Sequence, residues 1–189
     1  MRNLLDRITR GVRSVVAESS APDGQLIRVL SDQGKPWHDA EISIETAIKE
    51  TFSLSAEEGV SVFLAADERE EVRILAGHAL TRTVSKSAVQ YLLRLPARYV
   101  EAFELKQTPG GTGAKTIDVL HRDIFGDYEQ YKELCDKLKA DQKAGFDLVR
   151  VVSPKVVWPF FAEFEELPAA DLTTKARRKL RHYRSSAAG

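Results

Sequence analysis

The sequence predicts an α+β fold whose antiparallel sheet is of the ferredoxin-like type, a split βαβ arrangement with the order βαββαβ. Within residues 59–152, compact apolar runs with strand periodicity alternate with amphipathic segments of helical periodicity. Their order is strand, helix, strand, strand, helix, strand, which leaves few alternative topologies. We therefore expect one antiparallel sheet with both helices on the same face, and helical extensions at the N- and C-termini.

The length of 189 residues fits one folded core with extensions. We divide the chain into four parts. They are an N-terminal amphipathic helix (1–24), an irregular strand and helix lead-in (25–58), the ferredoxin-like core (59–152), and an aromatic segment followed by a basic C-terminal helix (153–189).

The extension and the lead-in have simple local signals. Residues 1–24 carry apolar side chains at steps of three and four, which predicts one helix face. In the lead-in we expect a short strand at 25–30 and a helix at 44–52, with Ser43 as its N-cap. Trp37 lies in the loop between them, and we expect it to anchor this loop on the core.

The first half of the core is predicted as a strand and a broken helix. Residues 59–65 are rich in branched and aromatic side chains, which is typical of a strand. Acidic residues follow at once and start a helix over 67–80, where they complement the helix dipole. A second helix is predicted from Ser85 to Pro96, because its apolar residues Val89, Leu92 and Leu93 fall on one helical face.

The second half of the core is predicted as a hairpin, a helix and a last strand. Alternating side chains indicate a strand over 99–107, and a second strand is expected over 116–122. The Gly- and Pro-rich residues 108–114 between them predict a flexible hairpin loop. A helix follows Asp127 as its N-cap, and residues 146–152 form the final strand.

Charge is segregated along the chain although 28 basic and 28 acidic residues give a formal net charge of zero. Residues 172–189 contain six basic residues and no acid. Such a tail either binds an external anion or folds back on the acidic body, and opposite charge leaves both alternatives open. The predicted residues for binding a partner or nucleic acid are Lys175, Arg177, Arg178, Lys179, Arg181 and Arg184.

A dense aromatic cluster lies between Pro154 and Pro168. It either covers the open face of the sheet or forms a surface for a partner or a second subunit, because both would remove its apolar area from water. The hydrophobic interface of the second hypothesis consists of Trp158, Phe160, Phe161 and Phe164.

The motifs for catalysis are incomplete, so we expect no catalytic residues and no cofactor. Glu104 and Lys106 have the E-x-K spacing of metal-dependent nucleases, but Asp118 follows them where such a nuclease has an earlier aspartate. Residues 110–116 miss the phosphate-loop pattern at two of its positions. His121, near acidic residues, is a poor candidate for a general base.

Composition also argues against a metal and a disulfide. The four histidines have no partner at metal-ligand spacing, and the single Cys135 excludes an internal disulfide. No apolar run is long enough to span a bilayer, so we expect no integral membrane association and a cytoplasmic protein.

These observations favour a non-catalytic subunit of a larger assembly, which acts as a scaffold or binds a protein partner or a second copy of itself. The alternative is a nucleic-acid-binding protein that uses the basic C-terminal helix.

Overall fold

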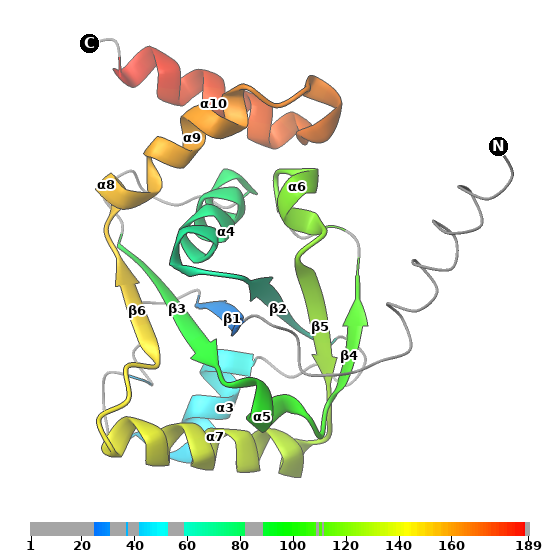
Figure 1. Cartoon of the computed structure of the whole chain (residues 1–189), viewed down its shortest axis with the longest axis vertical. Helices are drawn as coiled ribbons and strands as arrows, with labels where there is room; N and C mark the ends of the chain where they lie inside the picture. The colour runs from blue at the N-terminus through cyan, green and yellow to red at the C-terminus, as the bar shows by residue number, and fades with distance from the viewer. Residues whose placement is uncertain are drawn as a thin grey trace, which may run out of the picture.

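The computed structural model describes residues 25–30, 37, 42–52, 59–81, 89–108, 110 and 112–187. These residues form a six-stranded antiparallel sheet with helices on both faces (Figure 1), which confirms the α+β class. The strands in chain order are β1 (Gln25–Leu30), β2 (Val60–Ala65), β3 (Gln90–Leu95), β4 (Glu104–Gln107), β5 (His121–Phe125) and β6 (Val149–Val152).

The strand order is β4-β5-β2-β1-β3-β6, and every neighbouring pair is antiparallel. The neighbours β4, β5 and β2 lie as a ferredoxin-like sheet would place them. In that fold the last strand would pair with β2, whereas here β1 and β3 lie between β2 and β6. The strand order therefore does not confirm the ferredoxin-like arrangement.

One of the inserted strands replaces a predicted helix. The helix expected from Ser85 to Pro96 is wrong where the structure describes it, since β3 occupies Gln90–Leu95; residues 82–88 lie outside the described residues. Between β1 and β6, β3 buries Leu92 on one face and Leu93 and Leu95 on the other. A strand buried on both faces loses the alternation that identifies a half-exposed strand.

The helices confirm three predictions and correct two. The predicted helices at 44–52, 67–80 and after Asp127 are present. The predicted strands 99–107 and 116–122 are wrong in their first parts, where the helices Ala97–Val100 and Lys115–Asp118 lie. The strands themselves are confined to Glu104–Gln107 and His121–Phe125. The helices are α3 (Ile44–Phe52), α4 (Glu68–Thr81), α5 (Ala97–Val100), α6 (Lys115–Asp118), α7 (Tyr128–Lys143), α8 (Pro154–Val157), α9 (Pro159–Glu165), the 3-10 turn η1 (Ala169–Asp171) and α10 (Thr174–Ala187).

The two faces of the sheet carry separate hydrophobic clusters. Helices α3 and α7 cover one face, and α4 covers the other together with the C-terminal helices (Figure 1). The expectation that both core helices share a face is therefore wrong. Trp37 is buried on the α3 side, where its indole N–H donates to Thr51 Oγ1 at 2.8 Å. The helix predicted for residues 1–24 lies outside the described residues.

No helix in the described part of the chain combines the length and the apolar character that crossing a membrane requires.

Candidate functional site: a cavity between α9 and α10

The aromatic segment forms the outer layer over α4. Pro154 and Pro159 start α8 and α9, in the first helical turn, where proline costs no hydrogen bond. Phe161 and Phe164 are buried in the cluster that contains α4. These two of the four predicted interface residues thus cover the core.

The other two members of the predicted interface lie further out. Trp158 is 45% exposed. Phe160 is partly buried, and the guanidinium of Arg69 lies 5.3 Å from its ring centroid. Their contribution to an interface stays a prediction.

Helix α10, the predicted basic helix, packs on the body through its apolar stripe. Thr173 precedes the helix, and its hydroxyl accepts a hydrogen bond from the Ala176 N–H at 3.2 Å, as an N-cap does. Ala176 and Leu180 are buried, and the Tyr183 ring stacks on Phe161 with centroids 4.5 Å apart. Apolar packing therefore holds the tail against α4 and α9.

A glycine in the loop after β4 fixes the start of α10. The Gly113 N–H donates to the Gly77 carbonyl at 3.3 Å, and the Gly113 carbonyl accepts from the Thr173 N–H at 3.0 Å. A Cβ at residue 113 would lie 2.8 Å from the Cβ of Leu80 and 2.9 Å from that of Ala176. Only glycine permits this approach, so this part of the predicted hairpin loop is a docking point for the C-terminal segment.

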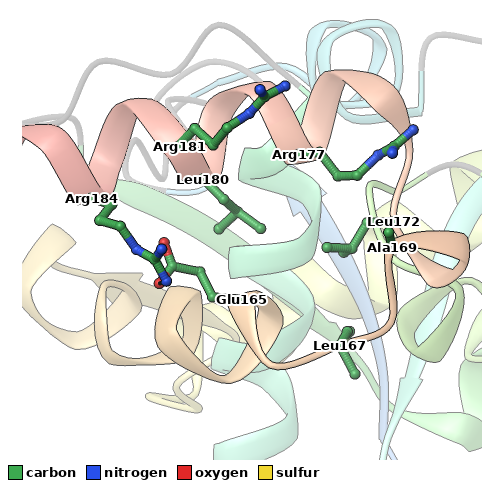
Figure 2. A pocket seen from close by; sticks show the side chains of 8 residues that line it. All are labelled: Glu165, Leu167, Ala169, Leu172, Arg177, Leu180, Arg181 and Arg184. Carbon is green, nitrogen blue, oxygen red and sulfur yellow. Dashed lines mark hydrogen bonds and ion pairs between the residues drawn. The ribbon is translucent and has the colours of Figure 1, made fainter.

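Between α9 and α10 lies a cavity of about 360 Å³, which we call the α9–α10 cavity (Figure 2). Leu180 points from α10 into this space, and Leu172 extends toward it from the connecting segment, which also carries the lining residue Leu167. Its floor is thus apolar and its margin is cationic. The lining residues are Glu165, Leu167, Ala169, Leu172, Arg177, Leu180, Arg181 and Arg184.

The cationic margin comes from one side of α10. Arg177, Arg181 and Arg184 are spaced by four and three residues, which places them in a row along the helix. The lining contains three guanidinium groups and one carboxylate, and Arg184 forms an ion pair of 3.3 Å with that carboxylate, Glu165. A guanidinium presents its donors in a planar fork that matches carboxylate and phosphate oxygens.

The other three predicted cations are placed differently. Lys179 lies on the opposite flank and donates to the Ala79 carbonyl in the last turn of α4, where a cation complements the helix dipole. Burial, and then the positive charge of Lys175, lower the pKa of the Lys179 ammonium. Lys175 and Arg178 are exposed away from the cavity. The predicted set therefore divides into a cavity row, a docking residue and an outer pair.

The histidine considered as a general base lies inside a polar cluster at the end of β4. Its Nδ1 is 3.1 Å from the Thr108 hydroxyl, and its Nε2 is 3.5 Å from Asp123 Oδ1. The Thr108 hydroxyl donates to the other oxygen of Asp123 at 2.6 Å. These contacts join Thr108, which follows β4, to two residues of β5, so the cluster fixes the end of β4 against β5. His121 is buried and is not among the residues that line the α9–α10 cavity.

The two residues with nuclease-like spacing pair with each other. Lys106 Nζ lies 3.0 Å from Glu104 Oε2 on the exposed strand β4. In the described part of the chain, no three His, Cys, Asp or Glu side chains gather where they could hold a metal ion.

Comparison with protein-family models, with curated proteins and with solved structures found no significant match. The cavity therefore has to be judged on its own chemistry. Sequence reasoning found the arginines but missed Leu167, Ala169 and Glu165, which come from the segment before α10. Three local signals of a helical hairpin are present in the sequence. Pro154 and Pro168 bound the aromatic segment, and Thr173 is the N-cap of the helix that follows.

Proposed function

We propose that this protein is a non-catalytic interaction subunit that binds an acidic amphipathic helix of a partner protein in the α9–α10 cavity. The observation that carries the proposal is the apolar floor beneath a row of three arginines. Recognition of an amphipathic helix needs both parts, because apolar anchors enter a groove while charged groups at its margin set the orientation.

The dimensions of the cavity support a small apolar anchor. A volume of about 360 Å³ lies at the lower end of ligand pockets, which span ~300 to 1,000 Å³. It accommodates a few large side chains of a partner. The arginine row from Arg177 to Arg184 extends about 10 Å at ~1.5 Å per residue. Acidic side chains spaced by four and three residues on a partner helix repeat that interval.

Nucleic-acid binding is the second candidate, and the outer pair is the observation that favours it. Lys175 and Arg178 extend the positive surface of α10 beyond the cavity. Phosphate groups would contact both the outer pair and the arginine row, and they would gain nothing from the apolar floor. For that reason the cavity favours a protein partner.

Two charge-reversal variants of the same helix separate these candidates. The first is Arg177→Glu with Arg181→Glu, in the cavity row, and its matched control is Lys175→Glu with Arg178→Glu, in the outer pair. The probes are a fluorescent helical peptide with leucines on one face and glutamates spaced by four and three residues, and a short DNA duplex. Fluorescence anisotropy at fixed salt measures both affinities.

For the proposed function, we expect the cavity variant to weaken peptide binding about tenfold or more, equivalent to ~1.4 kcal/mol, and the control to change it little. Ala169→Trp, which fills the cavity without changing charge, should also abolish peptide binding. Equal weakening of duplex binding by both variants, with no effect of Ala169→Trp, would establish the nucleic-acid candidate instead. A wild-type chain that binds neither probe would refute both.

A further inference from the structure

Strand β6 closes one side of the sheet, and no other described strand pairs with its outer side (Figure 1). The Arg94 N–H donates to the Leu148 carbonyl at 2.8 Å, which fixes the phase of the ladder between β3 and β6. Antiparallel strands direct their amide groups alternately to the two sides. Within β6, the N–H and C=O groups of Val149 and Val151 therefore point away from the sheet.

Exposed apolar side chains concentrate around this edge. The described residues include eight large hydrophobic side chains that are exposed, and five of them lie on β6 or beside it. Edges and patches of this kind mark surfaces where another chain pairs. The five residues are Val89, Phe146, Val151, Val156 and Trp158.

The charged residue of β6 does not protect this edge. Arg150 turns toward α4, where its guanidinium lies 2.6 Å from the Glu71 carboxylate and 3.4 Å from that of Glu68. Its positive charge is therefore compensated within the chain. Proteins commonly block an exposed edge with a lysine or another outward charge, and β6 has none among its four residues.

We infer that a second copy of this chain pairs with β6, so that two sheets join into one across a twofold axis. A twofold axis perpendicular to the sheet makes β6 antiparallel to its own copy, which continues the pairing of the whole sheet. It also keeps the corresponding faces of the two sheets on the same side.

Charge and pleating select the register of this pair. Residues opposite each other across an antiparallel pair point to the same face, so the axis passes beside either Arg150 or Val151. An axis at Arg150 would place two arginines opposite each other, and because each is already bound to Glu71 and Glu68 of its own chain, neither would gain a partner across the axis. An axis at Val151 places valine against valine and joins the outward N–H and C=O groups of both copies.

The flanking apolar residues supply the area that the short strand lacks. Stable dimers bury ~1,200 to 2,000 Å² in total, more than two four-residue strands offer. Phe146 lies five residues before Val151, and Val156 lies five residues after it. A twofold axis at Val151 therefore brings Phe146 of one copy near Val156 of the other. Trp158 follows α8 at the same end of the strand as Val156. Its exposure in the single chain is then explained by the second copy.

A lysine substitution on each edge tests the inference with a matched control. Val151→Lys adds a charge to β6 and places two lysines opposite each other in the proposed register. Leu105→Lys makes the equivalent change on β4, where Leu105 is 42% exposed. Sedimentation velocity at roughly 1 to 100 µM, the range of moderate affinity, should show a dimer for the wild type and for Leu105→Lys. Val151→Lys should sediment as a folded monomer.

A cysteine at the axis tests the register. The single native thiol, Cys135, is buried, and burial raises its pKa to about 12, so it does not compete. Residues opposite each other in an antiparallel pair have Cα atoms ~4.5 to 5.5 Å apart, within disulfide range. Under a mild oxidant Val151→Cys should form a covalent dimer and Leu105→Cys should not. A monomeric wild type, a dimer that survives Val151→Lys, or cross-linking only at residue 105 would overturn the inference.

Discussion

The two edge strands of the sheet, β4 and β6, differ in the side chains that they expose to solvent. All four residues of β4 are exposed, and Lys106 both pairs with Glu104 and lies 4.6 Å from the ring centroid of Phe125. Strand β6 has valines at three of its four positions, and its arginine is turned inward. A lysine on an edge strand discourages pairing with other chains, so β4 is protected in a way that β6 is not.

The inward arginine of β6 depends on a buried carboxylate. Glu71 of α4 is only 3% exposed and accepts two hydrogen bonds of 2.9 Å from the Arg94 guanidinium, in addition to the contact with Arg150. This cluster ties α4 to β3 and β6. The contrast between the edges thus rests on one buried acid, and changing that acid is the most direct way to disturb it.

The largest effect on stability is expected from Glu71→Gln. Removing the buried charge of this cluster leaves Arg94 and Arg150 with only the exposed Glu68 carboxylate. Breaking a buried pair costs ~3 to 5 kcal/mol, and the remaining Glu68 pairs together with the partial exposure of both arginines place our expectation near ~3 kcal/mol. The measurement is urea unfolding at neutral pH. Glu104→Gln on the β4 edge is the control, and its exposed ion pair should contribute less than ~1 kcal/mol. Similar losses for both variants would contradict the special role of Glu71.

The same carboxylate predicts a dependence on pH. Burial raises the pKa of Glu71, but hydrogen bonds from Arg94 and Arg150 outweigh it, so the pKa lies below its ordinary value. The stabilisation is therefore complete above the ordinary carboxyl pKa and is lost as the pH falls through the lowered one. The difference in unfolding free energy between wild type and Glu71→Gln should shrink as the pH is lowered from about 4.3, the ordinary pKa of a glutamate. A difference that grows on acidification would contradict the prediction.

The sequence predicts an edge strand well where local contacts form it, and poorly where contacts with distant parts of the chain decide the structure. The hairpin partner of β4 is close in the chain, and the sequence predicts this hairpin, although Ala97–Val100 is helical before Glu104. The helix of α5 depends on packing, since the Tyr99 hydroxyl donates to Asp141 on α7 at 2.8 Å. The sequence also predicts a strand over 146–152, of which the last four residues form β6. The neighbouring strand β3 is not predicted as a strand. Because it is buried on both faces, its apolar residues do not alternate, and their spacing fits a helix instead.

The candidate site shows the same limit. The basic row and its apolar stripe have a helical period, so both could be predicted from α10 alone. The cavity also needs Leu167 and Ala169 from the preceding turn, and it needs Gly113, which is far away in sequence. Such contacts are set by tertiary packing and leave no local pattern. The chain after β6 thus crosses α4 and docks beside the loop that follows β4.

Gly113→Ala should weaken the docking of the C-terminal segment on α4 and on the loop after β4. The added methyl group would meet the Cβ atoms of Leu80 and Ala176, and such overpacking costs ~1 to 3 kcal/mol. Combining it with Ala176→Gly, which removes one of the contacts, should restore part of the loss. Thermal unfolding of the two single variants and the double variant measures this coupling. Strict additivity of the two changes would show that the contact is not responsible.

Exchanging the character of the edges should move self-association from β6 to β4. In a Val151→Lys background, Glu104→Val with Lys106→Val removes the charges of β4 and leaves an apolar edge. We expect the dimerisation constant of the blocked chain to rise about tenfold or more, or ~1.4 kcal/mol. Sedimentation at several concentrations measures it, and a chain that stays monomeric would mean that the charges of β4 do not protect its edge.

The smallest effect is expected from Arg184→Ala, at the end of the cavity row. Its pair with Glu165 joins side chains that are 76% and 25% exposed, and exposed pairs contribute ~0.2 to 1 kcal/mol, so a loss below ~0.5 kcal/mol is expected. Salt should remove even that difference, because exposed charges are screened. Urea unfolding at low and high salt measures it. A salt-sensitive loss well above ~1 kcal/mol would mean that charge holds the tail on the body. In that case the arginine row would be occupied within the chain, and the apolar stripe under Leu180 would not be the main cause of docking.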